Sequence, residues 1–139
     1  MIEVVPGGAA DRAAVAGFIG QLYAAHDHPW DQDALLVRAD EMIAANAIYF
    51  LHRDGETIGY AALKEMGDHM FIRHFVIDAG MRREGVGSQA FRALEAACFP
   101  DRQVRLDASH KIERPRAFWE AQGFQVMGYT MRRDEAHAS

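Results

Sequence analysis

The stretch that decides the fold is FVIDAGMRREGVGSQAFRALE, residues 75–95. It begins in an apolar run that is typical of a strand, which we place at 69–78, and it continues as a helical pattern at 85–99. A second strand-like run, QVRLDAS at 103–109, follows the helix. A strand, a helix and a strand in this order predict a right-handed crossover between two parallel strands of one sheet.

The rest of the chain adds both kinds of element around this crossover. The turn RDGE at 53–56 contains Asp-Gly, which is among the strongest short signals for a hairpin. The remaining patterns predict a strand at 2–6, helices at 7–26 and 31–46, a hairpin at 47–63, a helix at 113–124 and a final strand at 125–133. We therefore expect one α/β (α+β) domain, residues 1–139, with a mixed, mostly antiparallel sheet, the order β-α-α-β-β-β-α-β-α-β and a frayed tail at 133–139.

Composition and charge exclude several classes of protein. Half of the 139 residues are apolar, which is enough for a folded core. The net charge of −5 argues against nucleic acid as a partner, because phosphate binding needs a basic surface. We expect no signal peptide and no membrane span, because no apolar run approaches ~20 residues. The single cysteine, Cys98, allows no intrachain disulfide, and we expect a cytoplasmic location.

The loop RREGVG, residues 82–87, precedes the helix of the crossover and is suited to an anion. A helix start offers unpaired N–H groups and the positive end of the helix dipole. Gly85 and Gly87 lack the Cβ atoms that would keep a ligand from the backbone, while Arg82 and Arg83 add donors suited to phosphate. The loop therefore predicts a pyrophosphate site, although a solvated turn without a ligand is the commoner role of such a glycine pair.

The segment GVGSQA, residues 85–90, also matches the G-x-G-x-x-G/A fingerprint of dinucleotide-binding folds. Asp107 lies 20 residues after Gly87, where an acid that binds ribose is expected. Three features weigh against this alternative. AGMRRE separates the glycines from their strand, only one crossover is predicted, and the preceding strands form an antiparallel meander. We therefore favour coenzyme A as the ligand that carries the pyrophosphate.

Two motifs make the chain resemble the GCN5-related N-acetyltransferase (GNAT) family. RREGVG fits that family's R/Q-x-x-G-x-G/A signature at Arg82, Gly85 and Gly87. AFWEAQGF, residues 117–124, is similar to a second signature, which commonly ends F-Y-x-x-x-G-F. The predicted element order also coincides with the usual topology of the family. The resemblance covers essentially the full chain and implies transfer of an acyl group from acetyl-CoA to an amine, without a metal.

The resemblance implies where acetyl-CoA binds. The loop amides that would hold the pyrophosphate belong to Arg82, Arg83, Glu84, Gly85, Val86, Gly87 and Ser88. The preceding strand would pair the backbone of Phe75, Val76 and Ile77 with the pantetheine arm, which enters where the next strand, near 104–108, splays away. The Phe75 N–H would then face the thioester carbonyl as the oxyanion donor.

The groups that move protons are less clearly marked. Trp119 stands where the family commonly has a tyrosine acid, and an indole N–H is no practical acid. Tyr129 on the predicted final strand is our candidate acid, with Ser109 or water as alternatives. His74 is the candidate base, and the neighbouring Arg73 is a candidate substrate contact. A core histidine satisfied by hydrogen bonds is the commoner role for such a residue.

HDHPWD, residues 26–31, connects the first two predicted helices, and in the family the corresponding segment shapes the acceptor site. His28 and Trp30 are therefore candidate substrate-binding residues, because an acidic, aromatic loop suits a cationic amine. A polar loop whose Trp30 closes the helix pair is an equally good interpretation. The His-x-His pair has no third ligand at a recognisable spacing, so we expect no metal site.

Together these features predict an N-acetyltransferase that moves an acetyl group from acetyl-CoA to a primary amine. A small-molecule or amino-acid-like acceptor is favoured, and protein N-termini or lysines are the nearest alternative. A non-catalytic acyl-CoA sensor stays open because of Trp119. We expect a small amine as partner and hold a homodimer as a further hypothesis, with neither nucleic acid nor membrane.

Overall fold

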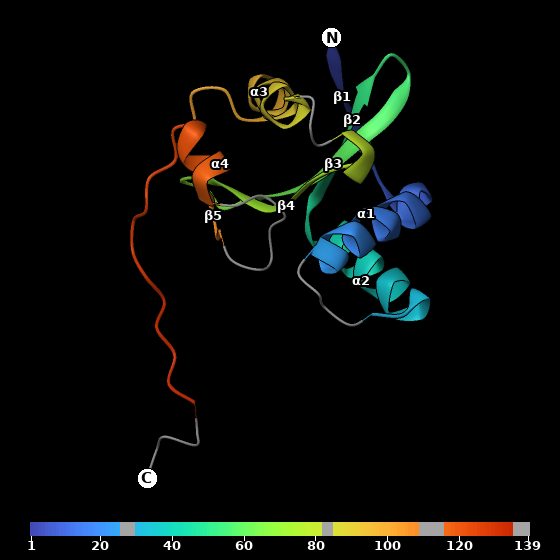
Figure 1. Cartoon of the computed structure of the whole chain (residues 1–139), viewed down its shortest axis with the longest axis horizontal. Helices are drawn as coiled ribbons and strands as arrows, with labels where there is room; N and C mark the ends of the chain where they lie inside the picture. Colours follow the sequence, from blue (N-terminus) through green and yellow to red (C-terminus); the bar gives the residue numbers. More distant parts are fainter. Residues whose placement is uncertain (26–29, 82–84, 109–115, 135–139) are drawn as a thin grey trace.

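The structure, a computed structural model, describes residues 1–25, 30–81, 85–108 and 116–134. A five-stranded sheet lies between two groups of helices (Figure 1). The elements are β1 (Ile2–Gly7), η1 (Ala9–Asp11), α1 (Arg12–Ala25), α2 (Gln32–Ala45), β2 (Ala47–Arg53), β3 (Glu56–Glu65), β4 (Met70–Ile77), η2 (Ala79–Met81), α3 (Val86–Cys98), β5 (Val104–Leu106) and α4 (Arg116–Ala121). The mixed, mostly antiparallel fold class expected from the sequence is confirmed.

The sheet follows chain order, β1-β2-β3-β4-β5. The first four strands are antiparallel neighbours, and β5 lies parallel to β4 after the α3 crossover, as predicted. The turn between β2 and β3 contains Asp54 and Gly55, whose φ angles of 53° and 82° are both positive. Positive φ at both central residues is what a type I′ hairpin turn requires, and its twist fits the flanking strands. The Asp-Gly pair therefore accounts for this hairpin.

The helices form two layers, and each layer packs on one face of the sheet (Figure 1). Ile19 of α1 and Leu35 of α2 are buried in one hydrophobic cluster together with Val76 of β4. Phe91 of α3 is buried in a second cluster together with Phe75 of β4. Consecutive residues of a strand point to opposite faces, so β4 supplies both clusters. The sheet therefore separates two hydrophobic cores.

β4 loses its partner β5 part-way along its length. The pairing with β5 covers only Met70–Ile72, opposite Val104–Leu106. The register between β4 and β3 shifts just after this point, which makes Arg73 the extra residue of a β-bulge. Residues 74–77 then pair with β3 on one side, and within the described ranges no strand pairs with them on the other. β4 and β5 therefore separate from the bulge onward.

The final strand predicted at 125–133 is wrong, because residues 124–134 adopt no regular secondary structure. Figure 1 shows this segment running away from the sheet. Its side chains Met127, Tyr129 and Met131 are 77%, 83% and 91% exposed. The residue pattern favours a strand, but a strand forms only where its backbone groups find a neighbouring strand. Among the residues that the structure describes, this segment pairs with none.

The bounds of several elements also differ from the prediction. β5 covers only Val104–Leu106 of the predicted 103–109, because its ladder with β4 ends there. The described part of the last helix is Arg116–Ala121, and Gly123, with a φ of 95°, follows it as a left-handed residue of the kind that ends helices. Within the described residues, every helix is too short or too polar to cross a membrane.

Candidate active site

The backbone of β4 presents hydrogen-bonding groups on the side from which β5 has separated. The Asp78 N–H donates to the Ile58 carbonyl at 2.8 Å, so Asp78 and every second residue before it face β3. By the same alternation, Phe75 and Ile77 direct their N–H and C=O groups away from β3. Phe75 lies beyond the end of the β4–β5 ladder. At Phe75 an extended ligand can therefore pair with this side of β4 as an added strand.

The side chain of Phe75 fixes this part of β4 within an aromatic cluster. Its buried ring lies 5.6 Å from the Trp119 ring, 5.9 Å from Phe91 and 6.2 Å from Phe118, measured between centroids. Trp119 is only 1% exposed, and its Nε1 has no hydrogen-bond partner in the described part of the chain. A buried donor without a partner costs about 1–3 kcal/mol. The cluster therefore holds one unused donor next to Phe75.

The start of α3 lies in the loop that the sequence predicts as an anion site. Its N-cap, Gly85, has a φ of 69°, in the left-handed region that favours glycine. Gly85 supplies no side-chain cap, so the first-turn N–H groups keep their capacity to bind an anion. Val86 and Gly87 are buried, and Ser88 Oγ accepts a hydrogen bond from Gln122 Nε2 at 3.0 Å. That bond ties the first turn of α3 to α4.

Several predicted site residues lie outside the described residues, namely His28, Arg82, Arg83, Glu84 and Ser109. The remaining candidates are spread over the fold. Arg73 is exposed at the bulge, Trp30 is 48% exposed just before α2, and Tyr129 lies on the extended segment after α4. The role of Tyr129 as an acid stays a prediction that this position does not support. No group of three or more potential metal ligands comes together in the described ranges.

His74 is buried on β4, with 5% of its surface exposed. Its Nδ1 lies 2.8 Å from the hydroxyl of Tyr60, which belongs to the core beneath α1 and α2. Burial, and then the positive charges of Arg38 and Arg73, lower the pKa of His74 to about 3. The ring is therefore neutral at pH 7 and a weak proton acceptor. These contacts fit the core histidine that the sequence left open as the commoner role.

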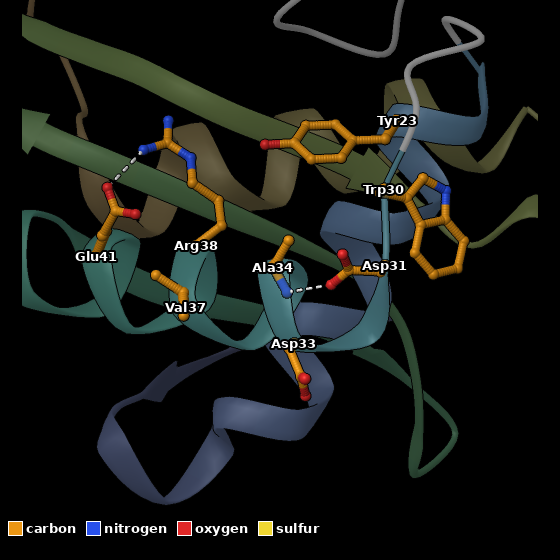
Figure 2. Close-up of a pocket in the computed structure, with 8 residues that line it drawn as sticks. All are labelled: Tyr23, Trp30, Asp31, Asp33, Ala34, Val37, Arg38 and Glu41. Atoms are coloured by element: carbon orange, nitrogen blue, oxygen red, sulfur yellow. Dashed lines mark hydrogen bonds and ion pairs between the residues drawn. The ribbon is translucent and has the colours of Figure 1, made fainter.

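A pocket of about 580 Å³ lies between α1 and the start of α2 (Figure 2). It is lined by Tyr23, Trp30, Asp31, Asp33, Ala34, Val37, Arg38 and Glu41. Asp31 caps α2 by accepting the Ala34 N–H at 2.7 Å, and Arg38 pairs with Glu41 at 3.4 Å. In Figure 2 the ring of Tyr23 comes from α1 and that of Trp30 from the segment ahead of α2. Two aromatic rings and three carboxylates therefore line one pocket.

Arg38 connects this pocket electrostatically with the sheet. Burial raises the pKa of Tyr60 above its usual range, and the Arg38 charge opposes that rise. The same charge lowers the pKa of His74 on the next strand. From the sequence, neither Arg38 nor Tyr23 was identified as a site residue. The signal that could have found the polar face of α2 is the spacing i, i+3, i+4, i+7 of Ala34, Val37, Arg38 and Glu41.

Comparison with known families decides the family of the chain. A model described as the acetyltransferase (GNAT) family matches residues 16–124. The chain belongs to the GNAT acetyltransferase family. The match includes both motifs of this GNAT chain and ends at Phe124, where the extended segment begins. The resemblance is therefore confirmed, and the dinucleotide alternative is set aside. Comparison with curated protein sequences gives no match.

Solved structures share the fold of this GNAT chain at low identity. A possible acetyltransferase from Clostridium difficile 630 matches with a TM-score of 0.72 at 15% identity, over 97% of both chains. Ribosomal-protein-alanine N-acetyltransferase from Brucella melitensis biovar Abortus 2308 matches with 0.72 at 15%, over 96% of this chain and 100% of that one. The aminoglycoside N-acetyltransferase AAC(6')-Iy, bound to the bisubstrate analog CoA-S-monomethyl-acetylneamine, matches with 0.66 at 18%, over 97% and 98%. Such identities establish the fold alone.

Proposed function

We propose that this GNAT chain transfers an acetyl group from acetyl-CoA to the primary amine of a small, cationic acceptor. The observation that carries the proposal is the open side of β4 at Phe75, where β5 no longer pairs. Along the chain it is followed by a helix start without a side-chain cap. A strand edge and an anion site are the two parts that an acyl-CoA needs. The single cysteine leads us to expect this activity in the cytoplasm.

The residues of the strand and loop fit acetyl-CoA. Apart from its chain neighbours, no residue of the described ranges lies within 4 Å of the position that a Cβ of Gly85 would take, so these residues leave a pyrophosphate free to approach the first-turn amides. Arg82 and Arg83 would add positive charge beside it. The backbone of Phe75–Ile77 would pair with the pantetheine arm. Bound in this way, acetyl-CoA supplies an activated acetyl thioester.

Phe75 would act through its backbone. Its N–H would donate to the thioester carbonyl oxygen and stabilise the negative charge that develops there when the amine attacks. A donor of this kind contributes about 10²–10³-fold to the rate. The packing of the Phe75 ring against Phe91 and Trp119 keeps the direction of that N–H fixed before the substrate arrives. This preorganisation is the contribution that we assign to the aromatic cluster.

Two proton transfers complete the reaction. An alkylamine has a pKa of about 10.4 and must lose a proton before it attacks. The pKa of about 3 makes His74 a poor base for this step. We therefore propose that water in the pocket between α1 and α2 takes up the proton of the ammonium group. The leaving thiol has a pKa of about 8.5 and departs tolerably without an acid. Because the thiolate can leave without an acid, the reaction can proceed with Trp119 at the position where the family commonly has a tyrosine.

The pocket between α1 and α2 supports a cationic acceptor. Its volume of about 580 Å³ lies within the range of small-molecule sites. Tyr23 and Trp30 offer ring faces to an ammonium group, and Asp31 and Asp33 add negative charge, while the charge of Arg38 in the same lining is paired with Glu41. One protein of the same fold is an aminoglycoside N-acetyltransferase. Amines with several positive charges are therefore the first class to test.

The test is a panel of acceptors. Thiol release from acetyl-CoA is measured with aminoglycosides, polyamines, amino acids and peptides that carry a free N-terminus. We expect turnover with small cationic amines, and turnover with peptides alone would support the protein acetyltransferase instead. Thermal-shift measurements with acetyl-CoA, CoA, NAD and NADP should show stabilisation by the coenzyme A species only. Stabilisation by the dinucleotides alone would contradict the proposed cofactor.

One observation favours a second candidate function, an acyl-CoA sensor without turnover. Trp119 replaces the residue that commonly serves as the acid in this family, and its Nε1 has no partner in the described part of the chain. A sensor needs the strand edge and the anion site, but it needs no proton transfer. Stabilisation by acetyl-CoA together with no thiol release for any amine would support the sensor.

A further inference from the structure

One side chain of the first helix layer holds the turn that follows β4. Gln21 of α1 accepts the Ala79 N–H at its Oε1, over 2.9 Å, and donates from its Nε2 to Oδ1 of Asp78, over 3.0 Å. A side-chain amide has an acceptor oxygen and donor hydrogens, so Gln21 uses both kinds of group on two neighbouring residues. These bonds link α1 to η2, the short helix at Ala79–Met81. The first helix layer therefore contacts the end of the strand on which acetyl-CoA is proposed to lie.

Asp78 is the residue at which β4 gives way to this turn. Its N–H donates to the Ile58 carbonyl on β3 at 2.8 Å, and its carbonyl accepts the Met81 N–H at 2.9 Å. The first bond continues the pairing of β4 with β3, and the second closes η2. The bond from Gln21 fixes the carboxylate of the same residue. The direction in which the chain leaves β4 is therefore set by the backbone and by the Gln21 side chain together.

The far end of η2 lies against the second helix layer. Met81 packs on the hydrophobic cluster that contains Phe91 of α3, and its sulfur accepts a hydrogen bond from Arg53 at 3.4 Å. In the sequence, only residues 82–84 separate Met81 from Gly85, the N-cap of α3. A connection of this length spans at most about 3.6 Å per residue, which limits how far η2 can lie from the start of α3. A displacement of η2 would therefore disturb the loop that is proposed to bind the pyrophosphate.

We propose that Gln21 is a positioning residue for the cofactor. By holding Asp78 and Ala79 it keeps the end of β4 and the start of the pyrophosphate loop in the arrangement that binds acetyl-CoA. This role rests on the proposed function, because that function places the acyl-CoA on β4 and on the loop. Gln21 does not need to touch the cofactor, since it acts through the turn.

The exposure of the turn explains why Gln21 should matter more for binding than for folding. Ala79 and Gly80 are exposed, so water can replace Gln21 at the Ala79 N–H without leaving a buried group unpaired. Without Gln21 the turn would populate several arrangements, and only some of them would suit the cofactor. The observed Kd rises as the fraction of molecules in the competent arrangement falls. Loss of Gln21 should therefore weaken the binding of CoA with little change in the free energy of unfolding.

Three variants of the contact between Gln21 and Asp78 test this role. Gln21→Met removes both hydrogen bonds without adding a charge, and methionine forms helices about as well as glutamine. Gln21→Glu sets a second carboxylate against that of Asp78. Gln21→Glu with Asp78→Asn exchanges the donor and the acceptor, so that the bond can form again. Gln103→Met is the matched control, because Gln103 is exposed, accepts from Arg105 Nε at 2.8 Å and lies beside the opposite end of β4.

The Kd for CoA is measured by calorimetric titration of each full-length variant, and amide exchange of Ala79 is followed in the free protein. We expect the Kd to rise at least about tenfold in Gln21→Met and in Gln21→Glu, since a hydrogen bond to a charged group shifts an equilibrium by about that factor. The double variant and Gln103→Met should stay within about threefold of the wild type. The Ala79 amide should exchange faster in Gln21→Met than in the wild type.

The outcomes separate this role from the proposed function. A wild type that does not bind CoA overturns the proposed function and the role of Gln21 with it. A wild type that binds CoA while Gln21→Met binds it equally well overturns the role of Gln21 alone. The role is also overturned if the double variant stays as weak as Gln21→Glu, or if Gln103→Met weakens the binding as much as Gln21→Met.

Discussion

The hydroxyl of Tyr60 lies 2.8 Å from Nδ1 of His74, inside the core beneath α1 and α2. Burial raises the pKa of Tyr60 and lowers that of His74 to about 3, so both side chains are neutral near pH 7. A phenol with a raised pKa keeps its proton and donates it to the ring nitrogen in the hydrogen bond. The pair thus joins β3 to β4 on the face opposite to the Phe75 ring.

The pH dependence of stability should report the buried His74. Its pKa is about 3 in the folded protein and about 6.5 in an unfolded chain, so the unfolded state binds more protons between these values. The free energy of unfolding should therefore fall as the pH drops from 6.5 toward 3. His74→Gln should flatten this dependence by up to about 1.4 kcal/mol per pH unit, measured by urea unfolding from pH 4 to 7.

A comparison of variants separates the contribution of His74 to the pH dependence of stability from that of other groups. The Arg102 guanidinium lowers the pKa of Glu65 to about 2, so the protonation of Glu65 also lowers the free energy of unfolding as the pH falls. This contribution is the same in the wild type and in His74→Gln. His52→Gln on β2 is the matched control for the replacement of an imidazole by an amide. An unchanged slope in His74→Gln would show that the ring is not held neutral by the fold.

Gly85→Glu should abolish the binding of CoA. The carboxylate would stand at the start of α3, where the pyrophosphate is proposed to lie, and like charges repel. Gly55→Glu is the matched control, because Gly55 also has a positive φ, 82° against 69°, but lies in the β2–β3 turn. Both substitutions should lower the free energy of unfolding by a similar amount, roughly 1–2 kcal/mol, because of the backbone strain. Calorimetric titration should show a Kd at least about 100-fold higher for Gly85→Glu alone, and retained affinity would refute the pyrophosphate site.

Trp119→Tyr should raise the turnover number of the enzyme. A phenol with a pKa near 10 can donate the proton that the thiolate needs, and an acid of this kind contributes about 10²–10⁴-fold in favourable cases. We expect at least about a tenfold rise in kcat with the best amine of the panel. Trp119→Phe is the control, since it has a similar ring but no acidic proton. Equal rates for the two variants would mean that protonation of the thiolate does not limit the reaction.

Trp30→Ala should weaken the acceptor without affecting the cofactor. The ring is 48% exposed at the mouth of the pocket, so its loss should change stability little. An exposed cation–π contact contributes about 0.5–1 kcal/mol, which predicts a two- to fivefold rise in KM for the amine. The KM for acetyl-CoA should stay constant. Met66→Ala, at the same 48% exposure but outside the pocket, should change neither constant.

The parts of the fold that depend on neighbours in sequence could be predicted. Asp54 and Gly55 tolerate the two positive φ angles that a type I′ turn requires, and the hairpin that this pair implies is present. The crossover from β4 to β5 follows from the succession of two strands around a helix. The GNAT resemblance rested on the loop before α3 and the motif at α4, and the family match covers both.

The remaining features depend on contacts between distant residues. The strand pattern at 125–133 says nothing about whether a sheet edge is available to it, and no strand of the described residues lies beside the segment. From its sequence position His74 is a candidate base, with a core histidine as the commoner role, and the choice is open until Tyr60, 14 residues earlier, is found 2.8 Å from its ring. Tyr23 and Arg38 meet in one pocket only because α1 and α2 pack side by side. No local pattern contains that information.

The division of the core by the sheet has an evolutionary consequence. α1 and α2 pack on one cluster and α3 and α4 on another, and the two share only the strands between them. A substitution that reshapes one layer therefore leaves the side-chain packing of the other largely untouched. The α1–α2 layer and the α3–α4 layer can therefore accumulate changes at different rates. At the acceptor pocket that we propose between α1 and α2, new preferences can arise while the α3–α4 layer is inherited almost unaltered.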